Sequence, residues 1–478
     1  QTASAVYEAL APLGKFGARA ESRLFDFVRS IAGVARNVGI ELEADGVTDA
    51  VRDAVAHHIA MRLGESGEVR AVVAAHADAD ASAEAFIYGA VTLRDGKYTL
   101  PLRLRSREGD VFWRAPEDAS ASLPTLTDAV ARSAARALQA SCVPDARIVI
   151  ASPEASELFM QARVEYRQFY RPQLEKAVQL LERVDQLEPN NPTIVAWHAA
   201  ALARIRFFDD APEKASELAR RAIALGARDA VPYVALAEAS LQDMRVVEAS
   251  RAFVTGLRIA PGAVDARVAF AHFLVELGAF EPATRLSESL RAADPHFPGT
   301  IDVPLRVAAF HGRFDEVRRI AETTPDENGG VRVRILVLRY AIWSRDRAMF
   351  DANAKRTNPA IFDPTTRFLF DSFKAAIVEG KSPQPIVDGA ISKLGPRRRA
   401  LVYQFMCELA AFLRDDQRFF DVLDRAVATG LFDTPWIDAC PLFDAYRGSL
   451  HFETARRTIH HRAYDALVEM DRCLGEPS

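Results

Sequence analysis

The stretch that decides the fold is PYVALAEASLQDMRVVEASRAFVTGLRIAP (Pro232–Pro261), followed directly by GAVDARVAFAHFLVELGAFEPATRLSESLRAADP (Gly262–Pro295). Four pairs of residues keep their character at a separation of 34 residues: Leu236/Phe270, Ala237/Ala271, Ala249/Ala283 and Pro261/Pro295. Small residues at fixed positions let two antiparallel helices approach where they cross, and a proline that cannot continue a helix ends each unit. The period therefore predicts a stack of helical hairpins, each covering the apolar side of its neighbour.

Weaker copies of the pattern extend the array in both directions. An earlier copy contains Ala177 and Pro189, and the next one, from Trp197 to Ala222, has two extra residues in its turn. Beyond Pro295, apolar residues recur every three or four positions with glycine or proline at the joints, which favours further hairpins. We expect about seven or eight hairpins over residues 152–430 and capping helices over residues 431–478.

Residues 44–145 have the pattern of a small α/β domain. The stretch FIYGAVTLRDGKYTLPLRLRSREGDVFWRA (Phe86–Ala115) contains three short β-rich runs, with Asp95-Gly96 and Glu108-Gly109 at turn positions. Alternation from residue 98 to 105 predicts one half-buried strand, in which Pro101 indicates an exposed edge. We expect helices over 47–63 and 126–140 and a parallel strand over 69–75. Residues 1–43 read as a helical lead-in that belongs to neither part.

The composition is that of a folded chain with no electrostatic reason to bind polyanions. Hydrophobic residues make up 49%, charged residues 26%, and the net charge is −5. This balance favours neither nucleic acid nor an anionic membrane as a partner. Charges interrupt every apolar stretch before about 18 residues, so we expect no direct membrane insertion. The expected location is cytoplasmic, or the extracytoplasmic side of a membrane-tethered protein.

The sequence contains none of the common motifs that carry catalytic chemistry. The four cysteines lie far apart, which predicts neither a zinc site nor a disulfide framework, and we expect no metal and no cofactor. The glycine spacing of a P-loop, a kinase catalytic loop and a His-Glu-x-x-His motif are all missing. The sequence predicts no catalytic residues and thus a chain that is not itself an enzyme.

The 34-residue pattern resembles the tetratricopeptide repeat. A wider resemblance covers ADGVTDAVRDAVAHHIAMRL, the β-rich run, SPEASELFMQARVEYRQFY, the repeats and the closing GLFDTPWIDACPLFDAYRGSLHFETARRTIHHRA (Gly430–Ala463). This order is similar to that of bacterial multidomain signalling proteins, in which an effector precedes a small α/β domain and a tetratricopeptide array. The effector is a Ser/Thr kinase, a cyclase, a TIR domain or a winged-helix regulator. The resemblance implies a mainly α fold, an α-solenoid after a small α/β domain, with any effector outside these 478 residues.

In tetratricopeptide arrays, the first helix of each repeat lines a concave face. The resemblance carries this role to polar residues at matching positions of this chain, namely His198, Arg206, Glu238, Gln242, Asp265, His272 and Glu276. Such a face of mixed charge suits an extended peptide or a helix held by a few anchors. The same residues also fit a solvated inner surface that binds nothing.

Three functions are compatible with these observations. The leading hypothesis is a non-enzymatic regulatory scaffold that binds a protein or peptide, as the sensor or docking part of a bacterial signalling protein. The second is a self-assembly module, a homo-oligomer that clusters an effector through the ends of the solenoid or the edge at Pro101. The third is an enzyme with a site between the α/β domain and the solenoid.

Overall fold

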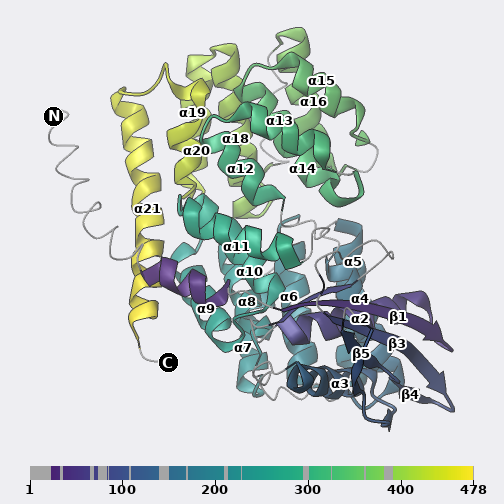
Figure 1. Ribbon diagram of the computed structural model, residues 1–478. Helices are drawn as coiled ribbons and strands as arrows, with labels where there is room; N and C mark the ends of the chain where they lie inside the picture. The colour runs from purple at the N-terminus through teal and green to yellow at the C-terminus, as the bar shows by residue number, and fades with distance from the viewer. Residues whose placement is uncertain are drawn as a thin grey trace.

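We describe the chain from a computed structural model (Figure 1). The structure describes residues 23–32, 36–64, 69–73, 83, 85–106, 109–138, 150–167, 171–208, 214–227, 229–293, 301–324, 326–359, 362–381 and 391–476. Cys142, part of the expected helical lead-in and the proline at 295 lie outside these residues. The architecture agrees with the expected class: a mainly α chain, with a tetratricopeptide-like α-solenoid after a small region that contains a sheet.

The sheet mixes parallel and antiparallel strands. Its strands are β1 (Arg36–Asp45), β2 (Val69–Val73), β3 (Ala85–Arg94), β4 (Lys97–Thr99), β5 (Arg103–Ser106), β6 (Val111–Arg114) and β7 (Ala119–Ser120). β1 lies between β2 and β3 and runs parallel to both. β3 then pairs antiparallel with β4 and β5, β4 pairs with β7, and β5 pairs with β6.

Two expectations for this region are corrected. Residues 36–43 belong to the central strand β1 and are not helical. The single strand expected over 98–105 is divided into β4 and β5, and Pro101, which has no N–H to donate, lies in the interruption. β4 has a neighbour on each side, so Pro101 marks no free edge there. The tight turn at Asp95 and Gly96 was correctly expected, with φ of 51° and 71°.

Two helices cover one face of the sheet. These are α2 (Asp49–Gly64) and α3 (Leu123–Ala137), close to the expected ranges. Val38, Ile40 and Ile87 on the covered face have no exposed surface, and they share a hydrophobic core with α2, α3 and the first helices of the solenoid. The sheet region is therefore fused to the solenoid by a common core.

The solenoid consists of helices that pack in consecutive pairs. They are α4 (Pro153–Arg167), α5 (Arg171–Leu187), α6 (Pro192–Ile205), α7 (Lys214–Ala224), α8 (Val231–Gln242), α9 (Val246–Ile259), α10 (Val264–Glu276), α11 (Phe280–Ala293), α12 (Asp302–Phe310), α13 (Phe314–Thr323), α14 (Asp326–Trp343), α15 (Arg347–Lys355), α16 (Pro364–Glu379), α18 (Pro396–Leu413) and α19 (Asp416–Ala428). The repeat alanines Ala237, Ala249 and Ala283 are fully buried. We call α4, α6, α8, α10, α12 and α14 the inner helices, because each is the first helix of its pair.

Local signals set the helix ends. At the start of α6, the Asn191 side chain accepts hydrogen bonds from the amides of Thr193 and Ile194, and Pro192 occupies the first turn. At the end of α16, Gly380 has φ of 63°, the left-handed conformation that terminates helices. Asn191 and Pro192 thus mark the start of α6, and Gly380 marks the end of α16.

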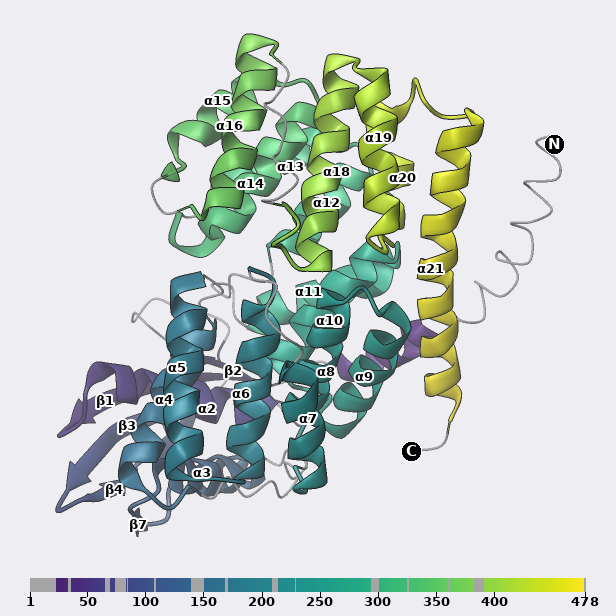
Figure 2. The same cartoon turned by 180° about the vertical axis from the view of Figure 1, so that it is seen from behind.

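The solenoid closes on itself at its carboxyl end. α20 (Thr434–Ala439) packs against α10 and α12, and α18 touches α8. The 26-residue helix α21 (Leu450–Gly475), yellow in Figures 1 and 2, runs back along the molecule and packs on α9. Both views also place the helix over residues 23–31 beside the far end of α21. Within the described part of the chain, no helix combines the length and apolar character that crossing a bilayer requires.

Candidate functional site

The seven polar residues expected on the inner surface lie on three neighbouring helices. α6 carries His198 and is capped by Arg206, α8 carries Glu238 and Gln242, and α10 carries the other three. α8 packs against both α6 and α10, so the three helices are neighbours in space. The contacts of these polar residues nevertheless divide them into separate groups.

Glu238 and Asp265 are brought together by Arg204, which was not among the residues expected from the repeat pattern. Arg204 Nε lies 3.2 Å from Glu238 Oε1, and its Nη2 lies 3.7 Å from Asp265 Oδ1. Its guanidinium also stacks 3.7 Å from the ring centre of Tyr166. The Arg204 and Glu238 side chains are only 6% and 9% exposed, and burial raises the pKa of Glu238 although Arg204 opposes the shift. The repeat register gave no signal for this pair, because the two extra residues in this copy align Arg204 with Ser240 and not with Glu238.

Glu276 belongs to a different cluster. Its carboxylate accepts hydrogen bonds of 2.8 and 2.9 Å from Arg397 of α18, and it lies 3.4 Å from Arg306 of α12. Arg306 also pairs with Asp433 at 3.4 Å. Glu276 therefore joins an inner helix to the carboxyl-terminal part of the chain.

The chain itself covers the inner surface at this point, through residues 430–436, which we call the closing segment. Phe432 packs edge-on against Phe273 of α10, with ring centres 5.8 Å apart. The Trp436 indole donates a 2.7 Å hydrogen bond to Glu408 of α18. Each of these closing-segment residues is at most 2% exposed. The closing segment therefore packs on α10 and α12, the first helices of two neighbouring hairpins.

Buried charges hold the closing segment in one register. Asp433 accepts from Gln404 at 3.2 Å in addition to its pairing with Arg306, and burial raises its pKa. Arg339 of α14 donates a 2.9 Å hydrogen bond to Glu408, the residue that also accepts from Trp436. Buried pairs of this kind add little net stability, but the loss of one partner is costly because it leaves an uncompensated buried charge.

The other expected residues have separate surroundings. Arg206 pairs with Asp243 at 2.5 Å, and His272 lies 3.1 Å from a guanidinium nitrogen of Arg332. His198 is 8% exposed, and burial lowers its pKa, so its imidazole is neutral at pH 7. Gln242 is half-buried at the end of α8. A role for these residues in binding a partner stays a prediction.

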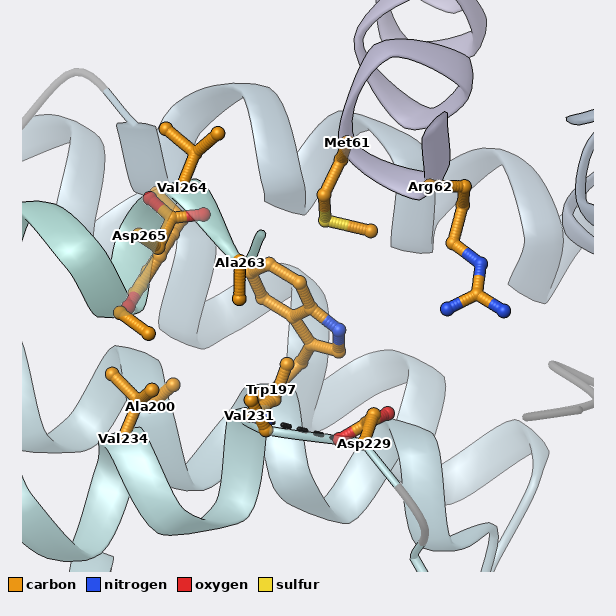
Figure 3. Close-up of a pocket in the computed structure, with 13 residues that line it drawn as sticks. Met61, Arg62, Trp197, Ala200, Asp229, Val231, Val234, Ala263, Val264 and Asp265 are labelled. Atoms are coloured by element: carbon orange, nitrogen blue, oxygen red, sulfur yellow. Dashed lines mark hydrogen bonds between the residues drawn. The ribbon is translucent and has the colours of Figure 1, made fainter. Parts of the chain in front are cut away.

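A small pocket opens where the end of α2 meets the inner helices (Figure 3). Its volume of about 40 Å³ leaves room for only a few water molecules. The walls are mostly apolar, and the lining residues include Met61, Trp197, Val231, Val234 and Ala263, with Asp229, Asp265 and Arg62 as polar members. One of the seven expected residues, Asp265, therefore lines the pocket.

The polar groups of the pocket are fixed by the protein. Asp229 accepts a 3.0 Å hydrogen bond from the amide of Val231, drawn as a dashed line in Figure 3, and burial raises its pKa. Arg62 pairs with the buried Asp128 of α3 at 2.6 Å. Among the described residues, no three His, Cys, Asp or Glu side chains are placed to hold a metal ion. The arrangement suits a single inserted side chain better than a substrate of metabolite size.

Comparison with known proteins gives a fold likeness only. No family model matches the sequence, and no curated protein sequence matches it. Among solved structures, the chain is similar to a monomeric mutant of IFIT1 with m7Gppp-AAAA in the anti conformation of the cap. The identity is 12%, the TM-score is 0.39, and the match covers 69% of this chain and 75% of the other.

This comparison corrects one expectation. The exclusion of nucleic acid, which rested on net charge, is wrong as a general statement, since the IFIT1 structure is described with m7Gppp-AAAA, a capped RNA. A likeness at this TM-score assigns no ligand to the present chain. The net charge therefore does not exclude nucleic acid, and the likeness does not support it.

Proposed function

We propose that the chain is a non-enzymatic scaffold that binds another protein, with the pocket between α2 and the inner helices α6, α8 and α10 as the anchor point. The observation that carries this proposal is the position of that pocket. It lies on the inner helices, contains Asp265, and is not covered by the closing segment. Protein partners are often held by one or two side chains seated in such pockets.

The chemistry of the pocket limits what the anchor can be. Trp197 and Val234 offer an apolar wall, and Asp229 and Asp265 place carboxylates beside it. A short side chain with an apolar stem, or one that ends in a hydrogen-bond donor, suits this combination. The small volume excludes a large aromatic anchor without movement of the walls.

Site-specific photo-crosslinking tests the proposal. A photoreactive residue replaces Ala263 at the pocket in the full chain, and a matched variant carries it at the exposed Glu175 on α5. We expect one partner protein to be crosslinked from position 263 and not from position 175. Adding Val231→Trp, which fills the pocket, should remove that product. Equal products from both positions, or no effect of the filling substitution, would show that the pocket is not the anchor.

The wider role is part of the same proposal. By its resemblance to bacterial signalling proteins, the chain would be the sensor or docking part of a longer protein, and any catalytic effector would lie in another segment. The sequence of the gene on the upstream side of Gln1 tests this directly. A kinase, cyclase, TIR or winged-helix domain encoded there is the expected result, and a gene without any effector would remove the signalling role.

A further inference from the structure

Within the described part of the chain, no helix packs along one of the two faces of the sheet. Along β1, Val38 and Ile40 point toward α2 and are buried, and the alternate residues point the other way. α2 and α3 pack on the covered side, and α11 only touches β2. The strands project at the lower right of the molecule in Figure 1, where this second face, the open face, is presented.

Charge changes sign across the open face. In the register of the sheet, Glu41 on β1 pairs with Tyr88 on β3, and Tyr88 pairs with Arg103 on β5. Residues paired in this way lie on the same face, so an acidic, an aromatic and a basic side chain form one row. The next strand continues the basic side, because Arg103 pairs with the exposed Arg114 on β6.

Two aromatic residues of β3, Phe86 and Tyr88, lie between the acidic strand β1 and the basic strand β5. Phe86 lies so close over Gly39 that a Cβ at position 39 would stand 2.7 Å from its ring. The Arg105 guanidinium stacks 4.7 Å from the Phe86 ring centre and 5.5 Å from that of Tyr88. Its Nη2 reaches to 3.8 Å from Oε2 of Glu41, whose side chain remains 41% exposed. Packed aromatic and guanidinium groups of this kind are frequent at the centres of protein interfaces.

We propose that the open face binds the open face of a second copy of this chain. The two-fold axis lies between the two sheets, parallel to β3. A half-turn about this axis places β1 of one copy over β5 of the other, so each Glu41 meets an Arg103 and the two Tyr88 rings meet near the axis. A half-turn about an axis across the strands would instead place β1 over β1 and carboxylate against carboxylate. Charge complementarity therefore selects both the partner and its orientation.

The open face is small for a specific protein–protein interface. β1 and β3 have 10 residues each, and β5 and β6 have 4 each. At about 3.3 Å per residue and about 4.8 Å between strands, the face measures on the order of 500 Å² per copy, or about 1,000 Å² in total. That is near the lower limit for specific interfaces, so we expect a weak, reversible dimer whose population rises with protein concentration. This inference stands apart from the partner pocket, which lies on other residues.

Sedimentation velocity on the full chain, over a wide range of concentrations, tests the proposal. We expect a concentration-dependent dimer, and Glu41→Arg or Arg103→Glu alone should raise its dissociation constant at least about tenfold, because each creates two like-charge contacts. An equimolar mixture of the two variants should regain the affinity, because both contacts then pair opposite charges. The double variant E41R/R103E should also dimerise for the same reason.

The matched control is Lys97→Glu, a charge reversal at the exposed hairpin tip away from the row, which should leave the dissociation constant unchanged. Circular dichroism on every variant separates loss of association from loss of folding. A chain that stays monomeric at every concentration overturns the proposal. So does a dimer that ignores both reversals, or single reversals whose mixture fails to regain affinity.

Discussion

Arg23 and Asp471, 448 positions apart in the sequence, form an ion pair with 3.3 Å between Nη1 and Oδ2. The helix over residues 23–31 also places Val28 and Ile31 in the core of the solenoid, where their exposed fractions are 0% and 1%. α21 covers the neighbouring part of α9 through Arg251 and Glu469, 2.7 Å apart. The two ends of the described chain therefore pack together on the outer side of the central repeats.

Acid should weaken the attachment of α21. Hydrogen bonds from Arg472, and then from Arg251, lower the pKa of Glu469 to about 2, although burial acts in the opposite direction. A carboxyl with a depressed folded pKa stabilises the fold above its unfolded pKa of about 4.3, and this stabilisation is lost as pH falls toward 2. Urea unfolding of the Glu469→Gln variant at pH 6 and at about pH 3 should show less acid sensitivity than the parent chain. Glu217→Gln, on the exposed side of α7, should keep the full acid sensitivity.

The closing segment should depend on the hydrogen bond between Trp436 and Glu408. Trp436→Phe keeps most of the apolar surface and removes the indole donor, which leaves a buried carboxylate with one partner fewer. We expect a loss of about 1.5–3 kcal/mol in unfolding free energy, the range for hydrogen bonds to charged groups. Trp113→Phe is the matched control, because its indole donates to the neutral hydroxyl of Ser133 at 3.0 Å. Equal losses in the two variants would contradict the importance given to Glu408.

Gly430 should be intolerant of a side chain for two separable reasons. Its φ of 97° is a left-handed conformation, and a Cβ there would stand 2.9 Å from Cβ of Met244 on the turn after α8. Gly226 has a similar φ of 90° but open space around it. Gly226→Ala should therefore cost about 1–2 kcal/mol for the backbone alone, and Gly430→Ala should cost more because of the added contact. Thermal unfolding of both variants measures the difference, and a smaller loss at 430 than at 226 would refute the close approach.

Arg204 should matter more than either carboxylate that it joins. Arg204→Leu removes the guanidinium that joins Glu238 and Asp265, and removing one partner of a buried pair costs about 3–5 kcal/mol. Glu238→Gln still leaves Asp265 beside Arg204, so its loss should be smaller. Urea unfolding of the two variants gives the comparison. A larger loss from Glu238→Gln would mean that Asp265 does not share the guanidinium.

Local sequence patterns predicted helices and turns correctly where a repeat or a turn motif was present. The 34-residue period gave the hairpins from α8 to α11, and the turn at Asp95-Gly96 gave the β3–β4 hairpin. β1 was missed because residues 36–45 carry both glycine and charge, and its place in the sheet depends on pairing with β2 and β3 on either side. Propensity cannot report such a strand, since its stability depends on partners far along the chain.

The candidate site was predicted only in part, for a related reason. The period named seven polar residues whose role in binding stays a prediction, and it could not show that Glu276 contacts Arg397, 121 positions away. Nor could it show that the Trp436 indole donates a hydrogen bond to Glu408 of α18.

The sequence by itself determined the helical array, because hairpin stacking depends on contacts between residues about one repeat apart. Tertiary structure alone decided how much of the array's inner surface remains open. The closing of α18–α21 onto α8–α12, and the pairing of Glu41, Tyr88 and Arg103 in one row, join segments whose separation in the sequence carries no periodic signal. The closing contacts depend on how small rotations between repeats accumulate along the solenoid, and the row depends on the pairing of strands that lie far apart in the sequence. No local pattern records either of them.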